Sequence, residues 1–114
     1  MRILVFESNL MWSSRLMQSL RGLGHEGVLL TRAPAEGSGA DAAIVNLGQT
    51  EPNPTELISV LQGLGIPVIA HSGHKETALR DVGKRAGVEV LATNSELTHK
   101  LGEILERIHK RVIQ

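Results

Sequence analysis

Four polar residues lie at or shortly after the ends of short apolar runs of the sequence, and together they could form a pocket: Glu7, Asn46, Ser72 and Asn94. If the apolar runs are parallel strands, these residues meet at the carboxyl ends of the strands, where open α/β sheets bind ligands. A repurposed pocket for a small ligand is therefore one interpretation. Hydrogen bonding of these side chains to one another and to nearby backbone is the other, and we favour it because clustered polar groups often serve structure.

Two histidines beside Ser72 suggest further chemistry. His71 and His74 have the His-x-x-His spacing of a metal-binding pair, and neutral imidazole binds zinc readily. On a strand and its following loop, however, the two rings need not face the same way. Only Glu7 is expected nearby as a carboxylate, and catalytic zinc needs three protein ligands, so we expect neither a metal nor a cofactor. Ser72 lacks the Gly-x-Ser-x-Gly turn of a nucleophile and could instead cap a helix that begins near Lys75.

Longer amphipathic stretches separate the short apolar runs. This alternation predicts a parallel sheet with crossover helices on both faces. The expected strands are residues 2–6, 28–30, 42–45, 68–70 and 88–91. The expected helices carry apolar stripes that should face the sheet: Trp12, Leu16, Leu20 and Leu23; Leu57, Leu61 and Leu64; Leu79, Val82 and Ala86; and, in one long terminal helix, Leu97, Leu101, Ile104, Leu105, Ile108 and Val112.

Local signals mark where these helices begin and end. Thr93 and Glu96 fit a capping box at the start of the terminal helix. Gly24, Gly65 and Gly87 stand where a helix must end and turn toward a strand, in a left-handed conformation that costs glycine little.

The connection over residues 31–41 does not fit the simple alternation. It is short and contains Pro34, Gly37, Ser38 and Gly39, so we expect no stable helix there. A connection of this length can cross one strand only as a strap that lies on the sheet. Such a strap would leave apolar surface thinly covered, which usually marks an interface, unless Pro34 and the alanines beside it pack down and seal it.

Composition excludes several classes of function. The 114 residues include 12 basic and 12 acidic side chains and are 41% hydrophobic, which predicts one compact soluble domain over residues 1–114. Cysteine is absent, which excludes thiol catalysis and cysteine-ligated metals and suits a reducing cytoplasm. A net charge of zero and an aromatic content of 2% argue against nucleic-acid binding. The first apolar run ends at Glu7, too early for a membrane span, so we expect a cytoplasmic protein.

Four segments resemble, in order and spacing, the receiver domains of bacterial response regulators: residues 3–9, 41–47, 67–73 and 87–94. The resemblance covers the whole chain. It implies a flavodoxin-like, doubly wound sheet of five parallel strands in the order 2-1-3-4-5, here with the second crossover helix shortened or missing. Because order and spacing carry it more than any motif does, it indicates a fold more strongly than an activity.

The resemblance also shows where this sequence departs from an active receiver. Such a domain has a nucleophilic aspartate, an acidic pair for Mg²⁺, a hydroxyl and a lysine. The resemblance places Asn46 at the aspartate and Asn94 at the lysine, and it places Glu7 and Ser8 at the acidic pair. Only Ser72 keeps the family's chemistry. A neutral amide cannot attack phosphorus, and one carboxylate is too few for tight Mg²⁺ binding, so we expect a degenerate pocket without phosphotransfer.

Our first hypothesis is a non-phosphorylatable receiver-like module of bacterial signal transduction, of the two-component or phosphorelay type. It would not be an enzyme, would bind another signalling protein through a fixed surface and could form a homodimer. Leu91 stands where the family often has an aromatic residue that rotates on activation. The resemblance therefore implies that this chain lacks the side chain that responds to phosphorylation as well as the aspartate that is phosphorylated. The candidate interface residues are Val60 near the strap, and Leu91, Arg107 and Arg111 around the fifth strand and the terminal helix.

Our second hypothesis is a small-molecule-binding or enzymatic flavodoxin-like domain that uses Glu7, His71, Ser72 and His74. An enzyme of this fold would normally present more than one carboxylate at the strand ends, and only Glu7 is expected there. A third is that the chain is a receiver-like piece of a longer regulator. Trp12 is interpreted as buried at the rim of the core instead of as a partner anchor, and the basic run over residues 107–111 as the solvated end of a helix.

Overall fold

One parallel sheet organises the chain, with the strand order β2-β1-β3-β4-β5. The strands are β1 (Arg2–Phe6), β2 (Glu26–Leu29), β3 (Ala42–Asn46), β4 (Val68–Ser72) and β5 (Val90–Thr93). They belong to a computed structural model that describes residues 1–37 and 39–113, and side chains only as far as residue 110. The strand order changes direction between β1 and β3, as in doubly wound flavodoxin-like sheets, so the predicted fold class and strand order are confirmed.

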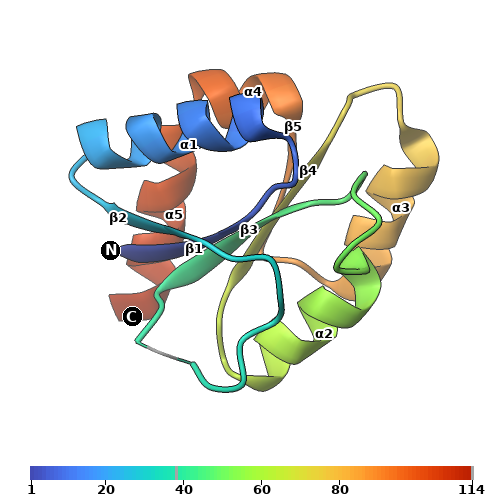
Figure 1. The fold of residues 1–114 in the computed structure, drawn as a ribbon, viewed down its shortest axis with the longest axis horizontal. Helices are drawn as coiled ribbons and strands as arrows, with labels where there is room; N and C mark the ends of the chain where they lie inside the picture. Colours follow the sequence, from blue (N-terminus) through green and yellow to red (C-terminus); the bar gives the residue numbers. More distant parts are fainter. Residues whose placement is uncertain (38, 114) are drawn as a thin grey trace.

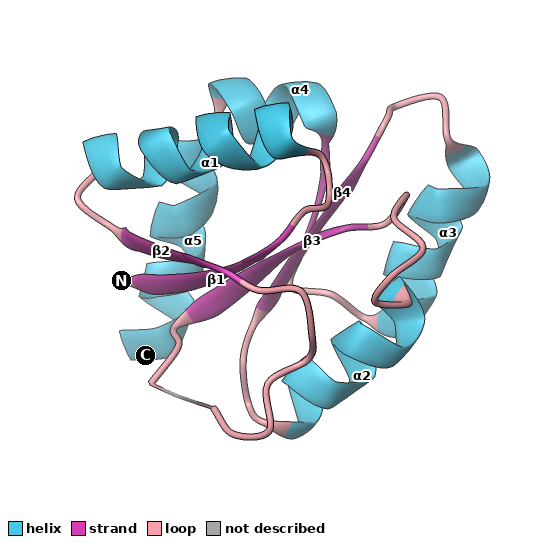
Figure 2. Cartoon of the chain, in the orientation of Figure 1, coloured by secondary structure: helices cyan, strands magenta, loops and turns pink. Residues whose placement is uncertain are grey.

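The helices cover both faces of this sheet (Figure 1). On one face lie α1 (Leu10–Gly22), α4 (Asn94–His99) and α5 (Leu101–Ile113), and on the other lie α2 (Pro54–Gly63) and α3 (Thr77–Ala86). The same two layers of helix with the sheet between them are visible in Figure 2. Strands that are buried on both faces can be apolar along their whole length, which explains why the strand segments of this sequence are nearly continuous apolar runs.

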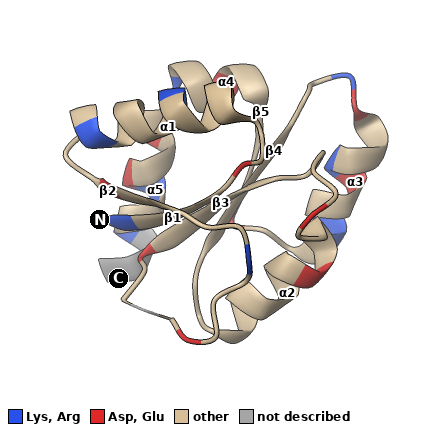
Figure 3. Cartoon of the chain, in the orientation of Figure 1, with Lys and Arg blue, Asp and Glu red and all other residues tan. Residues whose placement is uncertain are grey.

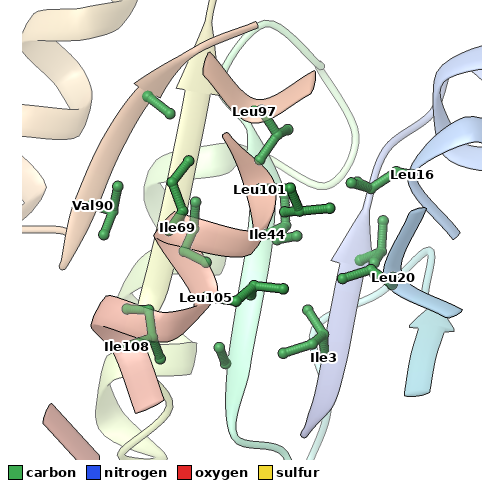
Figure 4. Close-up of a cluster of buried hydrophobic side chains, with 14 residues drawn as sticks. Ile3, Leu16, Leu20, Ile44, Ile69, Val90, Leu97, Leu101, Leu105 and Ile108 are labelled. Atoms are coloured by element: carbon green, nitrogen blue, oxygen red, sulfur yellow. The ribbon is translucent and has the colours of Figure 1, made fainter. Parts of the chain in front are cut away.

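Side chains alternate along each strand and so divide the core into two clusters. The cluster against α1, α4 and α5 includes Ile3 and Val5 of β1, Ile44 of β3 and Ile69 of β4 (Figure 4). The intervening strand residues pack against α2 and α3 in the second cluster, whose fully buried members include Leu4, Phe6, Leu57, Ile58 and Leu61.

Most predicted elements are present, with shifted ends. The second strand begins at Glu26 instead of residue 28, because residues 26–29 pair in parallel with residues 2–5. The fifth strand lies two residues later than expected. Leu16 and Leu20 of the α1 stripe are buried, but Leu23 is 47% exposed, because α1 ends at Gly22 and Leu23 is only its C-cap. The predicted left-handed turns are confirmed by φ angles of 84°, 74° and 71° at Gly24, Gly65 and Gly87.

The prediction of one long terminal helix is wrong. A break at Lys100, with φ −124° and ψ 23°, separates the six-residue α4 from α5. Gly102, which follows closely, lowers helix propensity at this point. Leu97 of α4 and Leu101 of α5 are both buried in the first cluster. The capping box is confirmed, since Thr93 and Glu96 each accept a hydrogen bond from the other's backbone N–H.

The connection between β2 and β3 contains no helix in its described residues, as predicted. It crosses the α2 side of the sheet and leaves a hollow of about 510 Å³ between itself and the strands. Pro34 is half-buried, but Ala33 and Ala35 are exposed and do not seal the surface beneath. Val28 and Leu30, which line the hollow, are only partly buried.

Charged side chains are distributed over several elements, with both signs present on the helices (Figure 3). This matches the net charge of zero. Among the described residues, no helix combines the length and the apolar character that a membrane crossing would need.

The packing of α3 against β5 gives a prediction about Gly83. A Cβ at this buried helical position would lie 2.8 Å from Leu91 Cδ1 and 3.2 Å from Leu47 Cδ1. Gly83→Ala should therefore lower the free energy of unfolding by about 1 kcal/mol, because overpacking outweighs the gain in helix propensity. Gly63→Ala is the matched control: nothing lies within 4 Å of its Cβ, so it should stabilise by about 0.5–1 kcal/mol. Urea unfolding of both variants measures the difference, and equal stabilisation by the two would contradict this packing.

Candidate functional site

A row of polar side chains continues the first core cluster at the carboxyl ends of the strands. Residue 7 follows Val5, residue 46 follows Ile44 and residue 71 follows Ile69, each two positions further along its strand and therefore on the same face. Asn46 and His71 are register partners in β3 and β4. Asn94, the first residue of α4, closes the row. The structure thus brings together four residues: Glu7, Asn46, His71 and Asn94.

The central contact of this row joins Glu7 to Asn46. The Asn46 Nδ2 donates to both carboxylate oxygens, at 3.0 Å to Oε1 and 2.9 Å to Oε2. The backbone N–H of Asn9 also donates to Glu7 Oε2, at 3.2 Å, and Asn46 Oδ1 accepts from Gly48 N–H at 2.8 Å. Glu7 is only 6% exposed. Burial of an ionised carboxylate is costly unless donors surround it, and these contacts supply those donors.

His71 lies beside this pair and is almost completely buried, at 1% exposure. Its Nδ1 is 2.7 Å from Asn94 Oδ1, and its Nε2 is 3.7 Å from Glu7 Oε1. The second distance is too long for a hydrogen bond, and Nε2 has no hydrogen-bond partner among the described residues. The ring centroid is 6.2 Å from that of Trp12 on α1. Trp12 is half-buried there, as its interpretation as a rim residue requires.

Burial is the largest influence on the protonation of His71, and it lowers the pKa of the ring below the ordinary 6.5. Two smaller influences oppose it. The hydrogen bond to Asn94 and the negative charge of Glu7 both favour the protonated ring and raise its pKa. The net direction is downward because desolvation penalises a buried charge more than these two contacts offset it.

The remaining predicted pocket residues lie apart from this row. Ser8 is exposed, and Ser72 is buried with its hydroxyl directed to Gly73 O at 3.4 Å. The expectation that Ser72 caps the next helix is wrong, because α3 begins only at Thr77 and Glu76 occupies its N-cap. His74 is exposed while His71 is buried, so the second hypothesis loses the convergence of Glu7, His71, Ser72 and His74 that it required.

Sequence reasoning missed two features of this site. It considered His71 only as a ligand or catalytic group and did not foresee its contact with Asn94; the shared position of the two residues at neighbouring strand ends was the available signal. It also did not select Asn9, whose side chain accepts from Trp12 N–H at the start of α1 while its own N–H binds Glu7. An asparagine directly before an apolar helical stripe is an N-cap signal.

The pocket does not fit a magnesium ion of the kind that the receiver resemblance implies. Both oxygens of Glu7 already accept from an amide N–H₂, and Ser8 offers an exposed hydroxyl instead of a second carboxylate. Within the described residues, no three histidine, aspartate or glutamate side chains are grouped so that they could hold a metal ion. Hard divalent cations prefer several carboxylate oxygens, which this arrangement does not offer.

The candidate interface residues occupy two different regions. Val60 is 41% exposed on α2, on the same side of the sheet as the strap. Leu91 is half-buried in the second cluster, where its Cδ1 packs over Gly83. Arg107 is exposed on α5, on the opposite side, and the side chain of Arg111 lies outside the described residues. Val60, Leu91 and Arg107 therefore do not form one continuous surface.

Comparison with known proteins places the fold among receiver domains. No protein-family model matches the sequence, and no curated protein matches it either. Among solved structures, a response regulator receiver protein from Pseudoalteromonas atlantica has a TM-score of 0.79 at 15% identity, over 98% of this chain and 99% of that one. The receiver domain of a Francisella response regulator gives 0.76 at 16% identity, over 97% and 98%.

A third similar structure is the receiver domain of a sensor histidine kinase from Pseudomonas aeruginosa PAO1, with a magnesium ion coordinated in its active-site cleft. Its TM-score is 0.77 at 19% identity, over 93% of this chain and 94% of that one. At these identities the likeness shows the response-regulator receiver (CheY-like) fold. The chemistry of the crevice has to be argued from the residues of this chain.

The lowered pKa of His71 predicts how stability depends on pH. The unfolded chain binds a proton near pH 6.5, whereas the folded chain binds it only at lower pH. The free energy of unfolding should therefore fall as pH decreases through about 6.5 and should level off below the pKa of the folded ring. Urea unfolding between about pH 7.5 and 5.5 measures this slope.

His71→Gln should flatten that dependence, because glutamine does not titrate. His74→Gln, at an exposed position, is the matched control and should retain the wild-type slope. A His71→Gln protein that still loses stability as steeply as the wild type would contradict the assignment.

Proposed function

We propose that this chain is a receiver-like module of bacterial two-component or phosphorelay signalling that is not phosphorylated. It acts in the cytoplasm by binding another signalling protein through a surface that no phosphoryl group switches. One observation carries the proposal: the side chain at the end of β3 is an amide whose N–H₂ is bound to both oxygens of Glu7.

The chemistry of Asn46 supports the absence of phosphotransfer. An acyl phosphate forms when a carboxylate oxygen attacks phosphorus, and a neutral carboxamide is too weak a nucleophile for this step. The Asn46 nitrogen donates to Glu7, and its oxygen accepts from Gly48 N–H. Both ends of the amide are therefore held in contacts that stabilise the fold.

The groups around Asn46 support the same conclusion. Asn94, which the resemblance places at the family's lysine, is neutral and is bound to His71. It offers no cation to pair with a phosphoryl oxygen. Glu7 is the carboxylate of the crevice, and its charge is already matched to donors of the protein itself. A dianionic phosphoryl group would enter a site that holds a buried negative charge without a metal or lysine to offset it.

A module that signals by binding a partner, without being phosphorylated, requires binding surfaces that are exposed in its single state. Two regions meet this requirement in the proposal. One is the surface of α5 on which Arg107 is exposed. The other is the α2 side of the sheet, where Val60 is exposed and Leu91 is half-buried, and where the connection between β2 and β3 leaves a hollow open. A homodimer through either region is compatible with the proposal.

Incubation with acetyl phosphate and Mg²⁺ tests the proposal directly. Intact-protein mass spectrometry should show no added phosphoryl group, while a phosphorylatable receiver domain treated in parallel gains one. A stable phosphoryl adduct on this chain would refute the proposal. A thermal-shift screen with nucleotides, flavins and divalent metals provides the complementary measurement. A rise of several degrees in Tm at micromolar ligand would favour a small-molecule-binding domain instead.

Asn46→Asp tests the account of the pocket. The new carboxylate would lie about 3 Å from Glu7 and would repel it, and the metal ligands and the lysine would still be missing. We therefore expect little or no phosphorylation of the variant under the same conditions. Robust phosphorylation of Asn46→Asp would show that the surrounding pocket is still competent and that residue 46 alone had been lost.

A further inference from the structure

The contacts of His71 leave two buried acceptors facing each other. Asn94 Oδ1 can only accept a hydrogen bond, so the His71 Nδ1 that lies 2.7 Å away carries the proton. In a neutral ring, Nε2 then has a lone pair and no hydrogen. This nitrogen is buried, has no hydrogen-bond partner in the described part of the chain, and faces a carboxylate oxygen of Glu7 at 3.7 Å. A second proton, on Nε2, would convert this unfavourable contact into an ion pair.

We propose that this crevice responds to a proton, and that uptake by His71 draws the carboxylate of Glu7 toward Nε2 and changes the start of α1. The inference rests on the proposed function, because it supplies a form of regulation to an interaction module that no phosphoryl group controls. A charge-assisted hydrogen bond of about 2.8 Å requires the 3.7 Å gap to close by about 0.9 Å. A movement of this size changes the geometry of every donor that Glu7 now accepts from.

Among the described residues, the charged group that faces the His71 ring is the carboxylate of Glu7, directly after β1. The other neighbours do not titrate near neutral pH: Asn46 comes from β3, Asn94 from α4 and Trp12 from α1. The charged groups nearest along the chain or across the sheet are directed elsewhere. They are His74, Lys75 and Glu76, which are exposed in the loop after β4, and Arg80, whose Nη1 donates to Ala92 O at 3.4 Å.

Glu7 is physically connected to an exposed apolar pair. Its Oε2 accepts from the backbone N–H of Asn9, and the side chain of Asn9 is the N-cap of α1. The first two residues of that helix, Leu10 and Met11, are 77% and 72% exposed, the highest values among the exposed large hydrophobic side chains of the described chain. A shift of the Glu7 carboxylate therefore acts on Asn9, the N-cap residue directly before Leu10 and Met11.

The net balance of interactions places the transition below neutral pH. Burial lowers the pKa of His71, while Asn94 and Glu7 partly offset this. At neutral pH the ring is uncharged, and Glu7 keeps its full set of contacts with Asn46 and Asn9. Acidification below about pH 6.5 moves the chain toward the ion-paired state. The groups involved lie at the carboxyl ends of the strands, so the expected change is local to that edge of the sheet.

The single tryptophan of the chain reports on this transition, because the Trp12 ring lies beside His71. Trp12 fluorescence should change in one sigmoidal step of one-proton steepness as the pH falls below about 6.5. In the same range, NMR should show the His71 ring titrating with an equal midpoint. The backbone amide signals of Leu10 and Met11 should move with it. Far-UV circular dichroism at each pH confirms that the chain remains folded.

Three variants assign the step to these residues. His71→Gln should abolish it. Glu7→Gln removes the attracting charge and should lower the midpoint by about 1 unit or more, whereas Asn94→Asp adds an acceptor with a negative charge and should raise it by a similar amount. The opposite shifts in two near-isosteric variants keep the test decisive even if His71→Gln does not fold. His25→Gln, far from the crevice in sequence and hydrogen-bonded to the N-terminal amine, is the matched control and should leave the step unchanged.

Several results would overturn the proposal. They are a fluorescence step that persists in His71→Gln, a midpoint that is the same in Glu7→Gln and Asn94→Asp, and a His71 titration during which the Leu10 and Met11 amides do not move. None of these measurements involves phosphate or magnesium. A phosphoryl adduct would refute the proposed function and would leave this titration intact, so the two failures are distinguishable.

Discussion

The buried contact between the Asn46 amide and the Glu7 carboxylate determines the character of this crevice. A carboxylate that is 6% exposed must be surrounded by donors, and one amide N–H₂ that reaches both of its oxygens satisfies much of that need. The same contact ties the ends of β1 and β3 together at the point where the strand order reverses. The carboxyl ends of these two strands are thus joined by a hydrogen-bonded amide–carboxylate pair.

Strand alternation explains why the crevice contains these residues and not others. Glu7, Asn46 and His71 extend the side of the sheet that faces α1 and α5, so they form the polar boundary of the first apolar cluster. Ser72 is adjacent to His71 in sequence and makes its hydrogen bond to Gly73 instead. The residues of this site are therefore not brought together by adjacency in sequence. They meet because each lies two positions after a core residue of its own strand, on the same face of the sheet.

The strands, and the lack of a helix in the described part of the strap, were predictable from the sequence, because they depend on local periodicity and on the proline and glycines of the strap. The strand order was predicted only through the resemblance to receiver domains. Hydrogen bonding of Glu7, Asn46, Ser72 and Asn94 to one another and to nearby backbone was also predicted. The structure shows it between Glu7 and Asn46 and between Ser72 and Gly73 O, whereas the side chain of Asn94 contacts His71. The break at Lys100 was not, since the apolar stripe continues through it in the sequence. The pairing of His71 with Asn94 likewise depends on three-dimensional register, which periodicity does not specify.

The strap makes local stability differ between the strands of the sheet. β2 is an edge strand whose burial is only partial, and it pairs on one side alone, with β1. β2 is packed by α1 on one face and, in the described part of the chain, has no crossover helix on the other, so fewer apolar contacts are lost when it separates from β1 than when a central strand separates. The remaining four strands retain their shared core when this happens. Amide hydrogens of β2 are accordingly expected to exchange with solvent deuterium through local fluctuations, well before those of β3 and β4, which exchange only when the whole domain unfolds.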